Sequence, residues 1–180
     1  NKWGVYPSLA LAWRIMEEPF VKDLNLFHNL KMRMGWGQTG NQAISPYNTL
    51  MLYNSTQYAS ADNSNMVGNV PANIANPNLT WEFSEQYNAG LDMGFLQGKL
   101  NATVDLYHKK THDLLLEKQL PGSTGFDKMF VNQGSIQNKG LEVTLDALAY
   151  ERKDWSVNVG ANFAINRNEV LSLGNDIIPT

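Results

Sequence analysis

The residues that could bind a metal ion are few, since the sequence holds three histidines and no cysteine. His108 and His112 stand four residues apart, a spacing that could bind zinc on a helix, but no glutamate lies between them as a zinc-protease motif requires. On a strand the two rings would lie about 13 Å apart, too far for one ion. We therefore predict no metal site and expect both histidines at a strand end or in a loop.

The segment Gly35–Gly40 matches the glycine spacing of a dinucleotide-binding loop letter for letter. Such a loop must open directly into a helix, whose N-terminus meets the phosphate groups. The residues that follow, 41–46, have no helical period. We interpret the segment as the end of a strand that enters a loop, where glycine permits tight backbone geometry, and we predict no cofactor.

The acidic and hydroxyl residues show no spacing that supports catalysis, and we predict that the segment is not an enzyme. A catalytic triad is defined by its geometry and cannot be assigned from residue order. Glu82 and Asp92 lie ten residues apart on one predicted strand, whereas a glycosidase needs two carboxylates about 5–9.5 Å apart. We interpret both, with Gln86 and Asn88, as polar groups of a lumen and as candidates for substrate contact.

Aromatic residues in the loops form a second set of candidates. Tyr47, Tyr53 and Tyr58 lie in a stretch rich in asparagine, and Trp81 follows it. These side chains could stack on sugar rings while asparagine forms hydrogen bonds to them. The alternative, which we favour, is that the aromatics anchor the loop and asparagine supplies turn conformations.

The composition narrows the class of protein that must position these residues. The chain has 180 residues and a net charge of -3, so no basic field points to nucleic acid as a partner. Only 17% of the residues are charged, which is low for a soluble domain. No apolar run approaches the ~20 residues of a transmembrane helix. If the chain meets a membrane, it does so with strands.

Alternation of apolar and polar residues is the main structural signal. The segments that alternate are Trp3–Ile15, Leu30–Gln38, Trp81–Phe95, Leu100–Tyr107, Leu141–Ala149 and Trp155–Ile165. These runs exceed the usual ~5–6 residues of strands in globular proteins. They predict roughly six long strands.

The connections between these segments alternate in length. Tight turns are expected near Gly98 and Lys153, whereas long loops follow Gln38, Thr111 and Arg167. Thr39–Thr80 is predicted to be mostly loop, with short strands near Tyr47–Tyr53, and Pro121–Gln133 to be a second loop. Short turns at one end and long loops at the other are typical of an outer-membrane barrel. We predict an all-β fold, an antiparallel up-and-down meander within a large transmembrane β-barrel whose long loops are extracellular.

The two faces of the clearest strand, Trp81–Phe95, define how the wall would sit in a membrane. The residues expected to face lipid or its interface are Trp81, Phe83, Tyr87, Leu91, Met93 and Phe95. The alternate residues Glu82, Gln86, Asn88 and Asp92 would face the lumen. Glu85 falls on the lipid side, so we expect it above the hydrocarbon, with Tyr87 at the outer aromatic girdle and Phe95 at the inner one.

Several blocks of the sequence resemble the C-terminal barrel of the SusC/RagA family of TonB-dependent transporters, and they occur in that family's order. The blocks are Trp3–Ser8, Ala12–Ile15, Glu17–Phe20, Leu30–Arg33, Gly37–Gln42, Asn76–Glu82, Gln86–Asp92, Val104–Tyr107, Lys110–Leu115, Asn132–Glu142 and Asn166–Val170. Together they span nearly the whole chain. The resemblance implies a plugged outer-membrane barrel of about 22 strands.

The same resemblance implies the partners and the location. The importer would lie in the outer membrane of a Gram-negative bacterium, in contact with its lipid, and would take up a glycan or a peptide. It would work with a SusD-like surface lipoprotein and with TonB, which the family contacts through a region N-terminal to this segment. We expect residues 1–180 to be a fragment of the barrel domain without the plug.

Two other functions are open at this point. A soluble β-sandwich that binds carbohydrate would pack two sheets around a closed core and would be extracted without detergent. An outer-membrane hydrolase on the same barrel would need Ser or Asp beside His on the outer rim, which no spacing supports.

Overall fold

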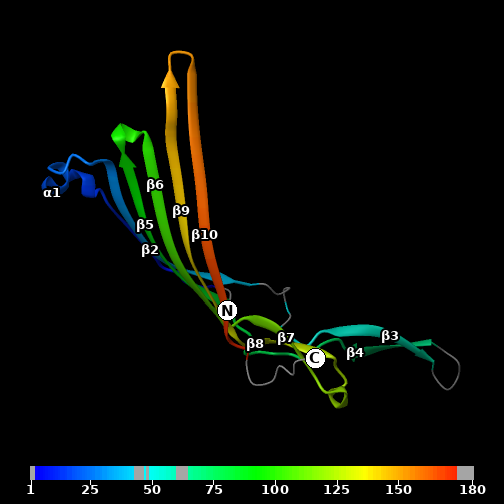
Figure 1. The fold of residues 1–180 in the computed structure, drawn as a ribbon. Coiled ribbons are helices and arrows are strands. Elements are labelled where there is room, and N and C mark those ends of the chain that lie inside the picture. Colours follow the sequence, from blue (N-terminus) through cyan, green and yellow to red (C-terminus); the bar gives the residue numbers. More distant parts are fainter. Residues whose placement is uncertain (1–2, 43–46, 48, 60–64, 174–180) are drawn as a thin grey trace.

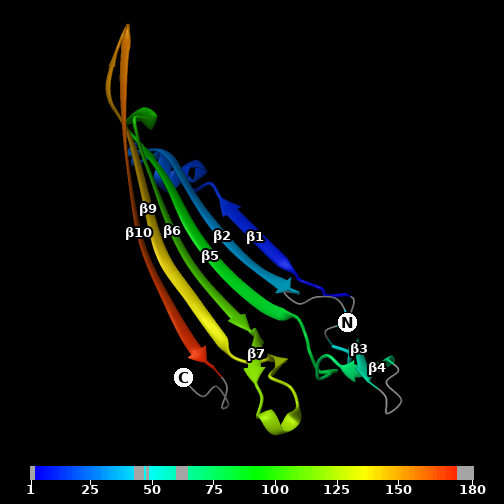
Figure 2. The same ribbon diagram turned by 90° about the vertical axis from the view of Figure 1, so that its right-hand side faces the viewer.

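The computed structural model describes residues 3–42, 47, 49–59 and 65–173. Its centre is a six-stranded antiparallel sheet in the order β1-β2-β5-β6-β9-β10 (Figures 1 and 2). The strands of this sheet, which we call the wall, are β1 (Ser8–Trp13), β2 (Phe27–Asn41), β5 (Glu82–Phe95), β6 (Leu100–His112), β9 (Ser135–Arg152) and β10 (Trp155–Ser172). The predicted antiparallel meander is confirmed, because each strand of the wall pairs with the wall strand before it.

Two small hairpins are inserted into this meander. They are formed by β3 (Tyr53–Ala59) with β4 (Asn65–Pro71), and by β7 (Leu115–Gln119) with β8 (Lys128–Asn132). Four short helical segments complete the described structure: η1 (Ile15–Glu17), α1 (Pro19–Lys22), η2 (Leu96–Gly98) and η3 (Gly122–Thr124). Both hairpins lie at one end of the wall, whereas α1 and the tight turns lie at the other (Figure 1).

The tight turns form where the sequence predicts them. Leu96, Gln97 and Gly98 all have positive φ, of 50°, 58° and 87°, and they reverse the chain between β5 and β6. Glycine tolerates this conformation without strain, which is why the turn closes at Gly98. Residues 153 and 154 join β9 to β10. The short connections therefore share one end of the wall.

Some strand bounds differ from the predictions for identifiable reasons. β1 begins only at Ser8, because Pro7 has no backbone N–H to donate to a ladder. β9 begins six residues before the predicted Leu141, at Ser135. Its first six residues are mostly polar, with Ile136 as the one apolar side chain, so they give no alternation, yet they pair with both β6 and β10.

The loop predictions were wrong in part. Within Thr39–Thr80 a hairpin runs over Tyr53–Ala59 and Asn65–Pro71, so of the described residues in the predicted stretch Tyr47–Tyr53 only Tyr53 lies in a strand. Pro121–Gln133 also contains strand β8. β3 is polar on both faces, so it lacks the period-two signal on which the prediction rests. Hairpin pairing of the backbone, and not burial of an apolar face, forms these strands.

The wall has no second layer of structure packed on it in the part of the chain that is described. Of the apolar residues that the structure describes, only Val21, Leu79 and Ala102 are buried. Leu106 lies on β6, with a strand on each side, and is still 54% exposed. The open, bowed sheet in Figure 2 thus leaves an apolar face uncovered, and this arrangement does not fit the two stacked sheets of a β-sandwich. Among the described residues, no helix is long and apolar enough to span a bilayer.

Candidate functional site: a two-faced wall and its loop end

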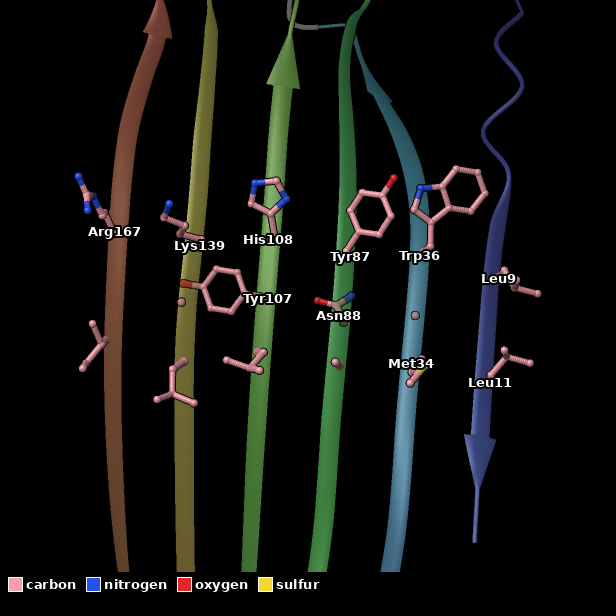
Figure 3. Close-up of a pocket in the computed structure, with 16 residues that line it drawn as sticks. Leu9, Leu11, Met34, Trp36, Tyr87, Asn88, Tyr107, His108, Lys139 and Arg167 are labelled. Atoms are coloured by element: carbon pink, nitrogen blue, oxygen red, sulfur yellow. The ribbon is translucent and has the colours of Figure 1, made fainter. Parts of the chain in front are cut away.

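The register of the wall aligns side chains of one kind across all of its strands. One such line, which we call the boundary row, crosses the wall from β1 to β10 (Figure 3). Its members are Leu9, Trp36, Tyr87, His108, Lys139 and Arg167. It therefore combines aromatic and basic side chains, with Trp36 and Tyr87 on β2 and β5 and the basic residues on β6, β9 and β10.

The lines on either side of the boundary row differ sharply in polarity. Toward the tight turns, the next two lines are entirely apolar. They are Leu11, Met34, Ala89, Leu106, Leu141 and Ile165, followed by Trp13, Met32, Leu91, Val104, Val143 and Phe163. Toward the loops, the next line is entirely polar on β2 to β10, with Gln38, Glu85, Lys110, Gln137 and Glu169. The boundary row marks the edge of an apolar band.

The lower edge of the band is also aromatic. Phe27 and Phe95 pack with their ring centroids 5.1 Å apart at the tight-turn end of β2 and β5. The eight residues from Tyr87 to Phe95 rise by roughly 19 Å at ~3.3 Å per residue and a ~45° tilt. With the girdle side chains added, this approaches the ~25 Å apolar band of an outer-membrane barrel. The predicted places of Tyr87 and Phe95, at opposite edges of the band, agree with this geometry.

Glu85 lies one line beyond the boundary row, two residues from Tyr87 and outside the membrane-spanning part of β5. Its carboxylate accepts hydrogen bonds from the indole N–H of Trp36 at 2.9 Å and from the hydroxyl of Tyr87 at 3.1 Å. The bond from Trp36, aided by the one from Tyr87, holds the pKa of Glu85 below its ordinary value, although partial desolvation opposes this. The carboxylate therefore stays ionised and fixes two girdle aromatics by their polar atoms.

On the opposite face of the wall, one arginine joins three strands. Arg33 on β2 donates to both carboxylate oxygens of Asp92 on β5 and to Oδ1 of Asp105 on β6, each at 2.9 Å. Gly90 lies between them, and a Cβ there would stand 2.4 Å from the Asp105 carboxylate and 2.7 Å from the guanidinium. The cluster occupies the polar face that the sequence assigns to the lumen.

The other predicted lumen residues lie on that same face. The side-chain amide of Gln86 donates to Asn88 at 2.9 Å. Glu82 is the first residue of β5, at the loop end. Asp92, by contrast, accepts hydrogen bonds from Arg33 on both carboxylate oxygens. Contact of Glu82, Gln86, Asn88 or Asp92 with a substrate stays a prediction.

The loop tyrosines are exposed, and the structure does not gather them into one site. Tyr53 and Tyr58 belong to β3, where an odd and an even position point to opposite faces of the hairpin. Tyr47 is 71% exposed and has a positive φ of 70°. The Tyr58 ring lies instead near Gly68 on the paired strand, which agrees with aromatics that cover their own hairpin.

An aromatic cluster of three residues lies at the loop end of the wall, and the sequence analysis missed one of the three. Tyr6 stacks on Trp81, with ring centroids 6.0 Å apart, and lies 6.5 Å from Phe83. The two partners lie on the predicted outer side of β5 but beyond Glu85. They therefore pack against Tyr6 above the band. The only sequence signal for this contact is Gly40, whose missing side chain leaves room for the Tyr6 ring.

Asparagine side chains tie the loops together, and the sequence analysis missed this role. Asn132 accepts from the backbone N–H of Thr80 at 2.6 Å and donates to the carbonyl oxygens of Thr80 and Asp113. Asn76 donates to the carbonyl oxygen of Phe130 at 2.8 Å. These bonds join the loop before β5 to the loop before β9. The available signal was that both asparagines lie in the blocks that resemble the transporter family.

The remaining motifs have structural explanations. Gly35–Gly40 lies wholly inside β2, so no helix follows its glycines. His112 ends β6, as predicted, but the prediction was wrong for His108, which lies inside that strand because β6 stays paired on both sides beyond it. His108 stacks with Tyr87, with ring centroids 6.5 Å apart. Within the described ranges, no three metal-binding side chains of His, Asp or Glu come together.

A single bowed sheet with an uncovered apolar band, a polar opposite face, short turns at one end and hairpin loops at the other is the wall of a membrane-embedded β-barrel. Comparison with known proteins refines this class. Residues 1–178 match the family described as TonB dependent receptor-like, beta-barrel, and the chain belongs to that family.

Individual relatives agree with this assignment. The chain is 40% identical over 179 residues to TonB-dependent receptor SusC of Bacteroides thetaiotaomicron, covering 96% of this chain and 18% of SusC. It is 36% identical over 174 residues to TonB-dependent receptor P39 of Formosa agariphila, covering 97% of this chain and 16% of that protein.

Solved structures agree as well. The structure of the RagAB peptide transporter matches with a TM-score of 0.84 and 32% identity, over 96% of this chain and 18% of that one. The segment is thus SusC/RagA-like and belongs in the outer membrane of a Gram-negative bacterium. It spans about a fifth of the length of these relatives.

Proposed function

We propose that this chain supplies part of the wall and two surface loops of a TonB-dependent importer that moves a nutrient across the outer membrane without catalysing a reaction on it. One observation carries the proposal: the wall has an apolar band bounded by aromatic residues on one face and the Arg33 cluster on the other. A soluble binding module has no use for an uncovered apolar band of that height.

The substrate class that we propose is an oligosaccharide or a peptide. The similar RagAB complex is a peptide transporter, and the family resemblance implies glycans as well. In this proposal Glu82, Gln86 and Asn88 line the passage, while Tyr47, Tyr53 and Tyr58 are the loop candidates for contact. A SusD-like surface lipoprotein and TonB are the proposed partners, and the plug domain would lie outside residues 1–180.

Deletion of the parent gene tests the transport function. The expected result is loss of uptake of one nutrient class, restored by the intact gene. Normal uptake of every nutrient, together with loss of a hydrolase activity, would overturn the proposal.

The orientation can be tested in intact cells. The chain has no cysteine, so one placed in this segment is unique there. Asn63, in the predicted long loop, lies outside the described residues, so Thr56 on the exposed strand β3 is the labelling position. A membrane-impermeant thiol reagent should label Thr56→Cys in intact cells and Lys153→Cys, in the turn at the opposite end, only after the outer membrane is breached. The reverse pattern would invert the topology.

A further inference from the structure

The boundary row ends in three neighbouring basic residues, His108, Lys139 and Arg167, on β6, β9 and β10. In Figure 3 Lys139 and Arg167 lie on neighbouring strands, and both side chains reach toward the loop end. Neither makes an ion pair with a described residue. Two adjacent basic side chains without a protein partner, at the edge of an apolar band, can bind one anion through charge-assisted hydrogen bonds.

The surroundings of this pair define what kind of anion would fit. Leu141 and Ile165 lie two positions below Lys139 and Arg167 on the same face, so the apolar band begins directly beneath the charges. Glu169 lies one line above Arg167, and no ion pair joins the two among the described residues. Glu85, the other carboxylate of that line, is held by Trp36 and Tyr87. A ligand with a negatively charged head and an apolar tail fits these surfaces, because its head would meet the basic pair and its tail the apolar band.

The height of the pair agrees with a lipid head group. At the tight-turn end, the Leu148 N–H of β9 donates to the carbonyl oxygen of Lys99, in the turn between β5 and β6. β9 continues beyond this bond to Arg152, so its own turn extends further than the β5–β6 turn. We place the tight turns at one common height in the membrane. A line drawn at right angles across the strands then rises from β5 toward β10, by about 3.4 Å per strand at a ~45° tilt and a ~4.8 Å strand spacing. Lys139 and Arg167 then stand above Tyr87, at the level of head groups and not of acyl chains.

We propose that Lys139 and Arg167, with His108 beside them, bind the phosphate of an anionic lipid in the outer leaflet, whose acyl chains lie on the band below. Cα atoms in neighbouring strands are about 4.8 Å apart, so one phosphate can accept hydrogen bonds from both side chains. The site is separate from the lumen and does not depend on which nutrient is imported.

The test uses the full-length transporter, purified in detergent, and native mass spectrometry with dioleoyl phosphatidylglycerol or dioleoyl phosphatidylcholine added at equal concentration. Lys139→Gln combined with Arg167→Gln should lower the occupancy of bound phosphatidylglycerol by roughly tenfold and leave phosphatidylcholine unchanged. The charge-preserving pair Lys139→Arg and Arg167→Lys should keep most of the binding. The control is Arg152→Gln with Lys153→Gln, which removes the same two charges at the opposite end of the same hairpin.

Three results would overturn the proposal. The first is that the parent transporter binds phosphatidylglycerol no better than phosphatidylcholine. The second is that both double glutamine variants lose phosphatidylglycerol binding equally, and the third is that inorganic phosphate at the same concentration displaces the lipid. The last result would mean a site for a free anion. Unchanged thermal unfolding of the three double variants in detergent shows that binding, and not folding, has changed.

Discussion

The wall and the loop end of this chain are held together by different kinds of bond. In the wall, continuous backbone ladders join the strands, and the apolar band accepts leucine, methionine, valine or phenylalanine at equivalent positions. At the loop end, a few side chains such as Asn132 and Asn76 bond to specific backbone atoms. The wall therefore tolerates exchange among apolar residues, whereas the loop end depends on individual residues.

The largest effect is expected where a charged residue replaces an apolar one in the apolar band. Leu91 lies midway between Tyr87 and Phe95, so Leu91→Lys places an ammonium near the midplane of the bilayer. It should destabilise the full-length transporter by about 2–4 kcal/mol, measured by urea unfolding in lipid vesicles. Leu91→Met, the matched control, should change stability by less than about 1.5 kcal/mol. Equal effects of the two changes would mean that Leu91 does not face lipid.

The second prediction concerns a place where the wall also depends on an individual residue. Arg33→Leu leaves Asp92 and Asp105 without their shared cation. The three side chains are 25–39% exposed, so the expected loss is about 1–2 kcal/mol by the same measurement. Lys31 lies on the same face with no ion pair to a described residue, and Lys31→Leu should stay within about 0.5 kcal/mol. A loss as large for Lys31 would contradict a special role for the cluster.

At the loop end, Asn132→Ala removes the three hydrogen bonds to Thr80 and Asp113. The expected loss is local and about 1 kcal/mol, seen as roughly fivefold faster hydrogen exchange at the Thr80 amide. Asn54, on β3, makes no side-chain hydrogen bond to a described residue, and Asn54→Ala should leave that amide unchanged. Equal exchange in both variants would show that the asparagine does not join the loops.

The smallest effect is expected at the β7–β8 hairpin. Lys128 pairs with Glu117 at 2.7 Å, but the side chains are 54% and 41% exposed. Lys128→Gln should lower stability by less than about 0.5 kcal/mol, and the difference should vanish at high salt. A loss that persists in about 1 M salt would show that this exposed pair does more than hold its own hairpin.

The same contrast explains what could be predicted from the sequence. Alternation located the wall strands, the turns at Gly98 and Lys153 and the two faces of β5, because one face had to meet lipid and the other water. It could not locate β3 or the start of β9, where mostly polar residues leave no regular alternation. Nor could it find the contacts of Tyr6 or Asn132, since such contacts join residues far apart in the chain and leave no period.

The candidate site shows this limit as well. The sequence placed Asp92 on the lumen face but gave no reason to pair it with Arg33, which lies 59 residues earlier in the chain. It identified Tyr87 as a girdle residue but not the basic residues at equivalent positions of β6, β9 and β10. Cross-strand neighbours depend on register, and register follows from the complete sheet.

The strand order of the wall has a consequence for how such a barrel is assembled. Each long strand is bonded only to its predecessor and its successor among the wall strands, so each can be added to the one already in place. Backbone groups that lack a partner are costly in hydrocarbon, which makes pairing and insertion into the bilayer a single event. This strand order would let the sheet grow hairpin by hairpin at one edge, with each strand placed serving as the template for the next.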